Sequence, residues 1–141
     1  MVCNCPQSLL RQGADLWPGQ IQDIETTDKT FKIPEDFNIN KYFEGCCGII
    51  SDKDTPIERV TIKTYAYARD YIATLPIHSS QKEIARDDES VTYQYHVRPT
   101  FDFLQALLAQ ADQIEVLEPE SVREEMKRFA ENLLLYYTNK M

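Results

Sequence analysis

The strongest constraint on the fold is an alternation of strand-like and helix-like stretches over residues 56–141. Residues 91–97 place valine or tyrosine at every second position, with threonine, glutamine and histidine between them, which is typical of a half-buried strand. Residues 60–64 alternate in the same way, and weaker strand patterns cover residues 81–85 and 114–117. Residues 65–75, 100–111 and 118–137 instead repeat apolar residues at helical spacing.

The predicted order is therefore β-α-β-β-α-β-α. A split βαβ repeat of this kind folds as an antiparallel sheet with both helices on one face, so we expect an α+β fold with a ferredoxin-like βαββαβ core and an extra C-terminal helix. Thr100 is expected to cap the second core helix, and Ser121 to begin the last helix in a capping box with Glu124. The last helix carries an apolar stripe that we expect to be buried, formed by Val122, Met126, Phe129, Leu133, Tyr136 and Tyr137.

Residues 1–55 lack this alternation of strand and helix patterns. They contain turn clusters and little periodicity, so we expect an irregular β-containing arm. The pattern predicts a strand over residues 20–27, an extended piece over residues 30–33 and a turn over residues 34–37. Asn38 or Asn40 is placed to cap a short helix that runs through Tyr42 and Phe43. We therefore divide the chain into an arm, residues 1–55, and a ferredoxin-like domain, residues 56–141.

Composition excludes several classes of protein. The formal net charge is −8 and the isoelectric point is near 4.7, which argues against a chain that binds nucleic-acid phosphates over its whole surface. No apolar run approaches the ~20 residues of a membrane span, and no secretory signal opens the chain. Four cysteines in two close pairs are too few for a disulfide framework, so we expect a reducing cytoplasmic location.

The cysteine pairs also do not suggest a metal centre. Cys3 and Cys5 are one residue apart and Cys46 and Cys47 are adjacent, whereas tetrahedral zinc sites favour gaps of two to four residues. No phosphate-binding, nucleophile-elbow or metalloprotease motif occurs either. We therefore expect no metal, no cofactor and no enzymatic activity.

One cluster of polar residues is predicted to converge. His78, Ser80 and Gln81 lie in the loop before one strand of a hairpin, and Arg98 ends the other strand. The hairpin turn at residues 87–90 brings both to the same end of the sheet, where a guanidinium and an imidazole are suited to an anion. His96 lies with Thr92, Gln94 and Arg98 on the polar side of the strand, either as a solvated face or as a surface for a ligand or partner.

Several segments resemble the C-terminal region of WYL-domain transcriptional regulators. Phe31-Lys-Ile-Pro-Glu-Asp-Phe37 matches a Phe-x-x-Pro-x-x-Phe signature of the linker that leaves the WYL domain, and residues 21–28 resemble the last WYL strand. Pro76-Ile-His-Ser-Ser-Gln81, with residues 59–62, 68–72, 101–108 and 116–119, resembles the extension that follows, often called WCX, whose fold is ferredoxin-like. The winged helix-turn-helix and the Trp-Tyr-Leu signature of that family are missing, so we expect a fragment of a longer regulator.

The resemblance implies a regulatory module that senses an effector and helps to hold oligomers together, without binding duplex DNA itself. It implies an anionic or nucleic-acid effector, and a homo-oligomer formed through the arm or the last helix. Two other functions stay open: a stand-alone protein-interaction module, and a small ferredoxin-like enzyme that uses His78 or His96 as acid or base.

Overall fold

The computed structural model describes residues 28, 30, 32–52 and 54–138, and the chain divides into two units, Met1–Phe37 and Asn38–Met141. In the first unit the expected turn is confirmed, because the backbone N–H of Phe37 donates to the carbonyl of Pro34 at 3.0 Å. Residues 30 and 32–34 form no strand. The strand predicted over residues 20–27 lies outside the described residues.

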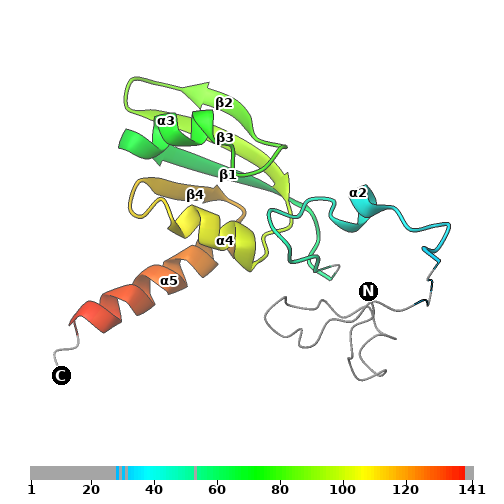
Figure 1. Cartoon of the computed structure of the whole chain (residues 1–141). Helices are drawn as coiled ribbons and strands as arrows, with labels where there is room; N and C mark the ends of the chain where they lie inside the picture. The colour runs from blue at the N-terminus through cyan, green and yellow to red at the C-terminus, as the bar shows by residue number, and fades with distance from the viewer. Residues whose placement is uncertain (1–27, 29, 31, 53, 139–141) are drawn as a thin grey trace. The chain divides into compact units, whose positions relative to one another are not determined.

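The second unit holds a four-stranded sheet and four helices (Figure 1). In chain order its elements are α2 (Ile39–Tyr42), β1 (Glu58–Tyr65), α3 (Ala66–Thr74), β2 (Lys82–Arg86), β3 (Ser90–Val97), α4 (Phe101–Leu108), β4 (Ile114–Glu118) and α5 (Glu120–Thr138). The strand order is β2-β3-β1-β4 and every neighbouring pair is antiparallel. The α+β class is confirmed, and the order is compatible with a ferredoxin-like core.

The core lies on one face of the sheet, which α3 and α4 cover (Figure 1). The alternation in β3 is confirmed: Tyr93 and Tyr95 are buried, whereas Gln94 between them is half-buried and His96 is exposed. Ile72 from α3 and Phe103 from α4 are fully buried against them. The other face of β3 and β1 is therefore left to polar side chains.

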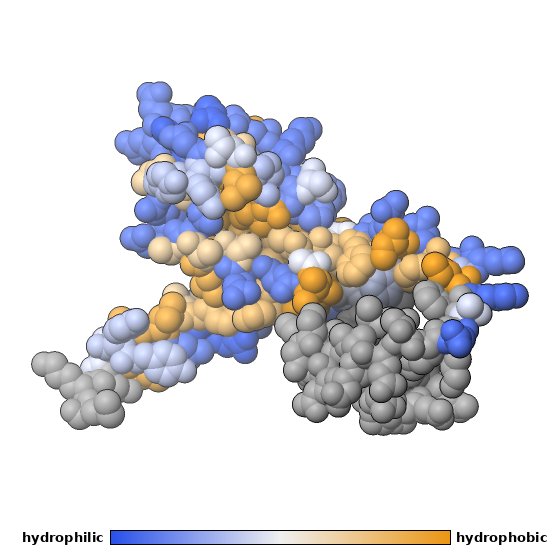
Figure 2. Space-filling model, in the orientation of Figure 1, coloured by the Kyte–Doolittle hydropathy of each residue, from blue (hydrophilic) through white to orange (hydrophobic). Residues whose placement is uncertain are grey.

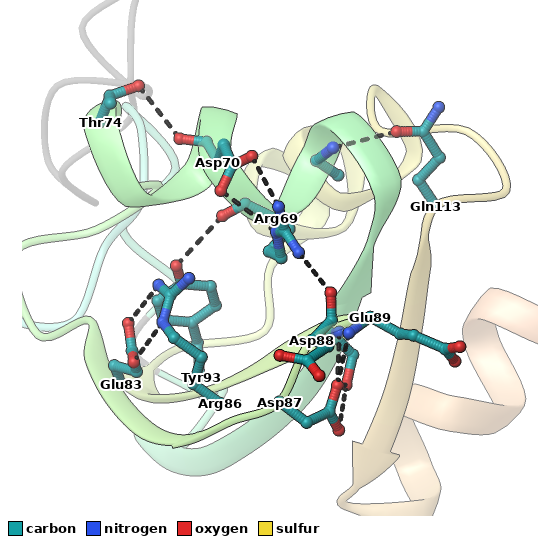
Figure 3. Close-up of polar contacts among 12 residues, drawn as sticks. Arg69, Asp70, Thr74, Glu83, Arg86, Asp87, Asp88, Glu89, Tyr93 and Gln113 are labelled. Atoms are coloured by element: carbon teal, nitrogen blue, oxygen red, sulfur yellow. Dashed lines mark hydrogen bonds and ion pairs between the residues drawn. The ribbon is translucent and has the colours of Figure 1, made fainter.

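Polar contacts fasten α3 to the β2–β3 hairpin (Figure 3). The guanidinium of Arg69 donates to the carbonyl of Asp88 at 2.7 Å, and the hydroxyl of Tyr93 donates to the carbonyl of Arg69 at 3.3 Å. The Asp87 carboxylate closes the hairpin turn by accepting from the backbone N–H groups of Glu89 and Ser90. These contacts fix the end of the sheet opposite to the one where β3 leads into α4.

The short arm helix α2 forms as predicted, with Asn38 as its cap. The Asn38 side chain accepts from the backbone N–H groups of Asn40 at 2.9 Å and Lys41 at 3.1 Å. Thr100 likewise occupies the position before α4, but its hydroxyl makes no capping bond there. The capping box at Ser121 was wrong, because α5 begins at Glu120 and places Ser121 inside its first turn.

The buried stripe predicted for α5 is correct only near the start of the helix. Val122 is buried, and Met126 and Phe129 pack partly against the core. Leu133 is 50% exposed and Tyr137 is 86% exposed, because α5 contacts β4 and α4 near its start and then extends beyond them (Figure 1). Among the residues that the structure describes, no helix is long and apolar enough to cross a membrane.

Candidate functional site

Arg98 fastens a stretch of the arm to the end of the sheet. We call this stretch, residues 44–52, 54 and 55, the arm segment. The Nε of Arg98 donates to the carbonyl of Glu44 at 3.2 Å, and its Nη1 donates to the carbonyl of Thr55. The backbone N–H of Arg98 also donates to the carbonyl of Gly45 at 2.8 Å. One residue at the end of β3 therefore holds the arm segment near its two ends.

Asp102 holds the same segment in its middle. It lies in the first turn of α4, and its Oδ2 accepts from the backbone N–H of Ile50 at 2.9 Å. A Cβ on Gly48 would lie 2.4 Å from that oxygen, so only glycine permits this approach. The Sγ of Cys47 adds a contact by donating to the carbonyl of Ile77 at 3.2 Å.

A second glycine permits the approach at Arg98. Gly45 has a φ of +73°, in the left-handed region that side chains with a Cβ rarely adopt. A Cβ there would also lie 2.9 Å from a side-chain carbon of Ile57. The arm segment is therefore shaped by glycines at both of its close contacts with the domain.

The loop before β2 fixes the tautomer of His78. The backbone N–H of Ser80 donates to Nδ1 of His78 at 3.1 Å, so Nδ1 is the acceptor and Nε2 carries the proton. Ser80 then binds β3, because its Oγ accepts from the backbone N–H of His96 at 2.9 Å and lies 3.1 Å from the carbonyl of the same residue. Partial burial lowers the pKa of His78, which favours the neutral ring.

Gln81 joins three backbone and side-chain groups inside the domain. Its Oε1 accepts from the backbone N–H of Ile77 at 3.2 Å and from the hydroxyl of Tyr95 at 2.8 Å. Its Nε2 donates to the carbonyl of Ile72 at 2.8 Å. Burial raises the pKa of Tyr95, so this hydroxyl stays protonated and keeps donating.

The four residues predicted from sequence as an anion site thus lie at the same end of the hairpin, but they have different partners. Ser80 contacts both His78 and the backbone of His96, two residues before Arg98. Gln81 is engaged with Tyr95, and the Arg98 guanidinium is engaged with the arm segment. Whether the four residues bind an anion stays a prediction.

A cavity of about 600 Å³ opens next to these residues. It lies among α2, the start of the arm segment, the residue before β1, the His78 loop and the end of β3. Its lining residues are Ile39, Asn40, Phe43, Glu44, Gly45, Ile57, His78, Ser79 and His96. Sequence reasoning missed the arm side of this cavity, although the glycine at position 45 indicates a close backbone approach there.

The described cysteines are free thiols. Burial raises the pKa of both Cys46 and Cys47, which disfavours the reactive thiolate. Cys3 and Cys5 lie outside the described residues. Within the described ranges no group of three or more histidine, cysteine, aspartate or glutamate residues is placed to hold a metal ion.

The family comparison decides the class of the domain. The model of the WCX domain family matches residues 56–134, which is more than half of the chain. The chain belongs to the WCX domain family. No curated protein matches the chain. The WCX match begins at the residue before Ile57, so the contacts of Arg98 and Asp102 reach from the WCX domain to backbone that precedes it.

Proposed function

We propose that this chain is the effector-sensing and oligomerisation end of a WYL-type transcriptional regulator. WCX domains are C-terminal extensions of WYL-type regulators, and the family match therefore supports a regulatory role. The observation that carries the finer proposal is the attachment of the arm segment by Arg98. In such a regulator the arm joins this domain to the rest of the protein, so its attachment is a means of transmitting a signal.

The proposed effector is an anion or a nucleic-acid fragment that competes for Arg98. A guanidinium forms bidentate contacts with phosphate or carboxylate that are stronger than its bonds to neutral carbonyls. An anion at Arg98 would replace the carbonyls of Glu44 and Thr55 and loosen the arm segment. Effector binding would thereby change how the arm leaves the domain.

Hydrogen exchange of the full chain tests this mechanism. Amide protection in residues 44–52 is compared with and without short single-stranded oligonucleotides, nucleotides or inorganic phosphate at millimolar concentration. We expect a bound anion to lower protection there, and Arg98→Ala to lower it without any ligand. Unchanged protection with every anion, or equal NMR shifts of His78 in the parent and in Arg98→Ala, would overturn the effector proposal.

The C-terminal half of α5 supports the oligomerisation part of the proposal. Five consecutive large side chains are at least half exposed, namely Leu133, Leu134, Leu135, Tyr136 and Tyr137. In the space-filling view, apolar residues interrupt the hydrophilic surface along this helix (Figure 2). Exposed patches of this kind are typical of protein contacts, since tyrosine and leucine bury large apolar areas there.

Sedimentation velocity of the full chain tests the oligomer. We expect a self-associated species that Leu134→Glu converts to monomer, whereas Glu120→Lys, a charge change at the exposed start of the same helix, leaves association unchanged. A monomer at high micromolar concentration would overturn oligomerisation through α5. If the chain associates through α5 but no effector binds, the stand-alone interaction module becomes the better function. We expect no catalysis in either case.

A further inference from the structure

The cavity beside Arg98 differs in its chemistry from the anion site expected from sequence. Among its lining residues there is no lysine or arginine, and Glu44 supplies a carboxylate. Arg98 itself is not a lining residue and donates to arm carbonyls. A negative ligand would therefore meet a like charge in the cavity without a permanent cation to offset it.

The apolar part of the lining is left open to solvent. Ile39 is 54% exposed, and Phe43 and Ile57 are each 39% exposed. Ile39 belongs to α2, Phe43 directly follows α2, and Ile57 directly precedes β1, and the three side chains line one cavity. Binding pockets are commonly lined by such side chains with a few polar groups that fix orientation, and the volume is within the range for small ligands.

The polar part of the lining consists of Asn40, Glu44, His78, Ser79 and His96, and two of these, His78 and Glu44, carry the argument. Because Nδ1 of His78 is occupied by the Ser80 N–H, the proton on Nε2 is the one that a ligand can accept. The Glu44 carboxylate accepts a hydrogen bond when it is ionised. A ligand that fits both groups carries an acceptor beside an N–H donor.

We infer that this cavity binds a small uncharged aromatic ligand that carries a carbonyl or ring-nitrogen acceptor next to an N–H donor, such as an aromatic amide. Its ring packs on Phe43, Ile39 and Ile57, its acceptor takes the His78 Nε2 proton, and its N–H donates to Glu44. Such a ligand contacts both α2 and the domain, so it stabilises the attached arm. This inference rests on the proposed function only for its effect on the arm, and the binding itself stands independently of that function.

Three probes of the same shape and different charge test the inference at pH 7.5: benzamide, benzoate and benzamidine. Heteronuclear NMR titrations of the full chain should show benzamide shifting the resonances of residues 39–45, 57 and 78, at a lower concentration than either charged probe. If benzoate or benzamidine binds as tightly as benzamide, or if none of the three shifts these resonances up to millimolar concentration, the inference is overturned.

Two variants connect binding to the proposed contacts. His78→Asn keeps an acceptor for the Ser80 N–H but lacks the Nε2 proton, so benzamide binding should weaken by about three- to ten-fold, as for one lost hydrogen bond. Phe43→Ala removes a wall of the cavity and should also weaken binding. Tyr67→Ala, an exposed aromatic residue on α3, is the matched control and should change nothing.

The cavity proposal and the anion-effector proposal are overturned by different measurements. Unchanged benzamide affinity in both His78→Asn and Phe43→Ala would overturn the cavity assignment even if anions loosen the arm segment. Conversely, benzamide binding with no change in amide protection of residues 44–52 would keep the site and remove its connection to the arm.

Discussion

The carboxylate of Asp102 accepts a hydrogen bond from the backbone N–H of Ile50, 52 residues earlier in the chain, at 2.9 Å. The contact is partly buried, and Gly48 beside it leaves room for the carboxylate. A buried backbone N–H that loses its partner costs about 1–3 kcal/mol, whereas a net hydrogen bond contributes about 1 kcal/mol. The Asp102 contact is therefore a measurable part of the attachment of the arm segment.

We expect Asp102→Ala to lower the free energy of unfolding by about 1–3 kcal/mol, because it leaves the Ile50 N–H without an acceptor. Asp102→Asn keeps an oxygen acceptor and should cost less. Urea unfolding followed by circular dichroism measures both losses, and amide exchange at Ile50 should increase with them. Asp112→Ala on the exposed surface is the control. Equal stability of Asp102→Ala and the parent would contradict the role of this contact.

Shortening the arm tests the attachment as a whole. A chain that begins at Ser51 loses the carbonyls of Glu44 and Gly45, which accept from Arg98, and the N–H of Ile50. We expect it to be less stable than the full chain by at least about 1 kcal/mol, the net value of one or two hydrogen bonds. A chain that begins at Asn38 keeps these contacts and serves as the reference for the shorter chain. The two shortened chains are compared by thermal unfolding; identical melting of both would show that the arm segment contributes nothing.

The fold was predictable where local patterns and tertiary burial agree. The period of two in β3 comes from an alternation of buried and solvated positions, and the structure has the same alternation. Asn38 was recognisable as a cap because its function is local. The stripe of α5 was misjudged since an apolar helix face looks the same in sequence whether it covers its own core or is left for a partner.

The candidate site was less predictable, because its contacts are long-range and use backbone atoms. The guanidinium of Arg98 donates to carbonyls, and any residue has a carbonyl, so nothing in the sequence of residues 44–55 names it as a partner. Gln81 looked like a ligand residue but serves the structure, with bonds to Ile72, Ile77 and Tyr95. The one available signal was the glycine at position 45, which sequence reasoning did not connect to Arg98.

Replacing each of three apolar side chains by alanine should show that core residues contribute more to the free energy of unfolding than residues at the exposed end of α5. Phe103→Ala removes a fully buried ring and should cost about 3–5 kcal/mol. Phe129 is only half-buried, so Phe129→Ala should cost less, about 1–2 kcal/mol at 25 cal/mol per Å² of lost apolar burial. Leu134→Ala should leave the stability of the monomer within about 0.5 kcal/mol. Chemical unfolding at low protein concentration measures all three, and a loss for Leu134→Ala equal to that for Phe129→Ala would contradict the exposed end of α5.

Stability should also depend on pH through His78. Burial lowers the pKa of this ring in the folded chain, whereas in the unfolded chain it titrates near 6.5. As pH falls below about 6.5 the unfolded chain takes up a proton that the folded chain does not, so the unfolded state is favoured. We expect the free energy of unfolding to fall between pH 7 and pH 5. Protonation of Nδ1 would also remove the acceptor for the Ser80 N–H, which acts in the same direction.

Two variants assign this pH dependence. His78→Asn keeps an acceptor near Ser80 and does not titrate, so its free energy of unfolding should change less between pH 7 and pH 5 than that of the parent chain. Ser79→Ala changes an exposed neighbour that does not titrate, keeps His78 and should retain the parental slope. Above pH 5 the carboxylates whose pKa is lowered, such as Asp87 with its bonds from Ser90, are ionised in both states and add little slope. Urea unfolding across this range checks the assignment, and a parental slope in His78→Asn would show that another group is responsible.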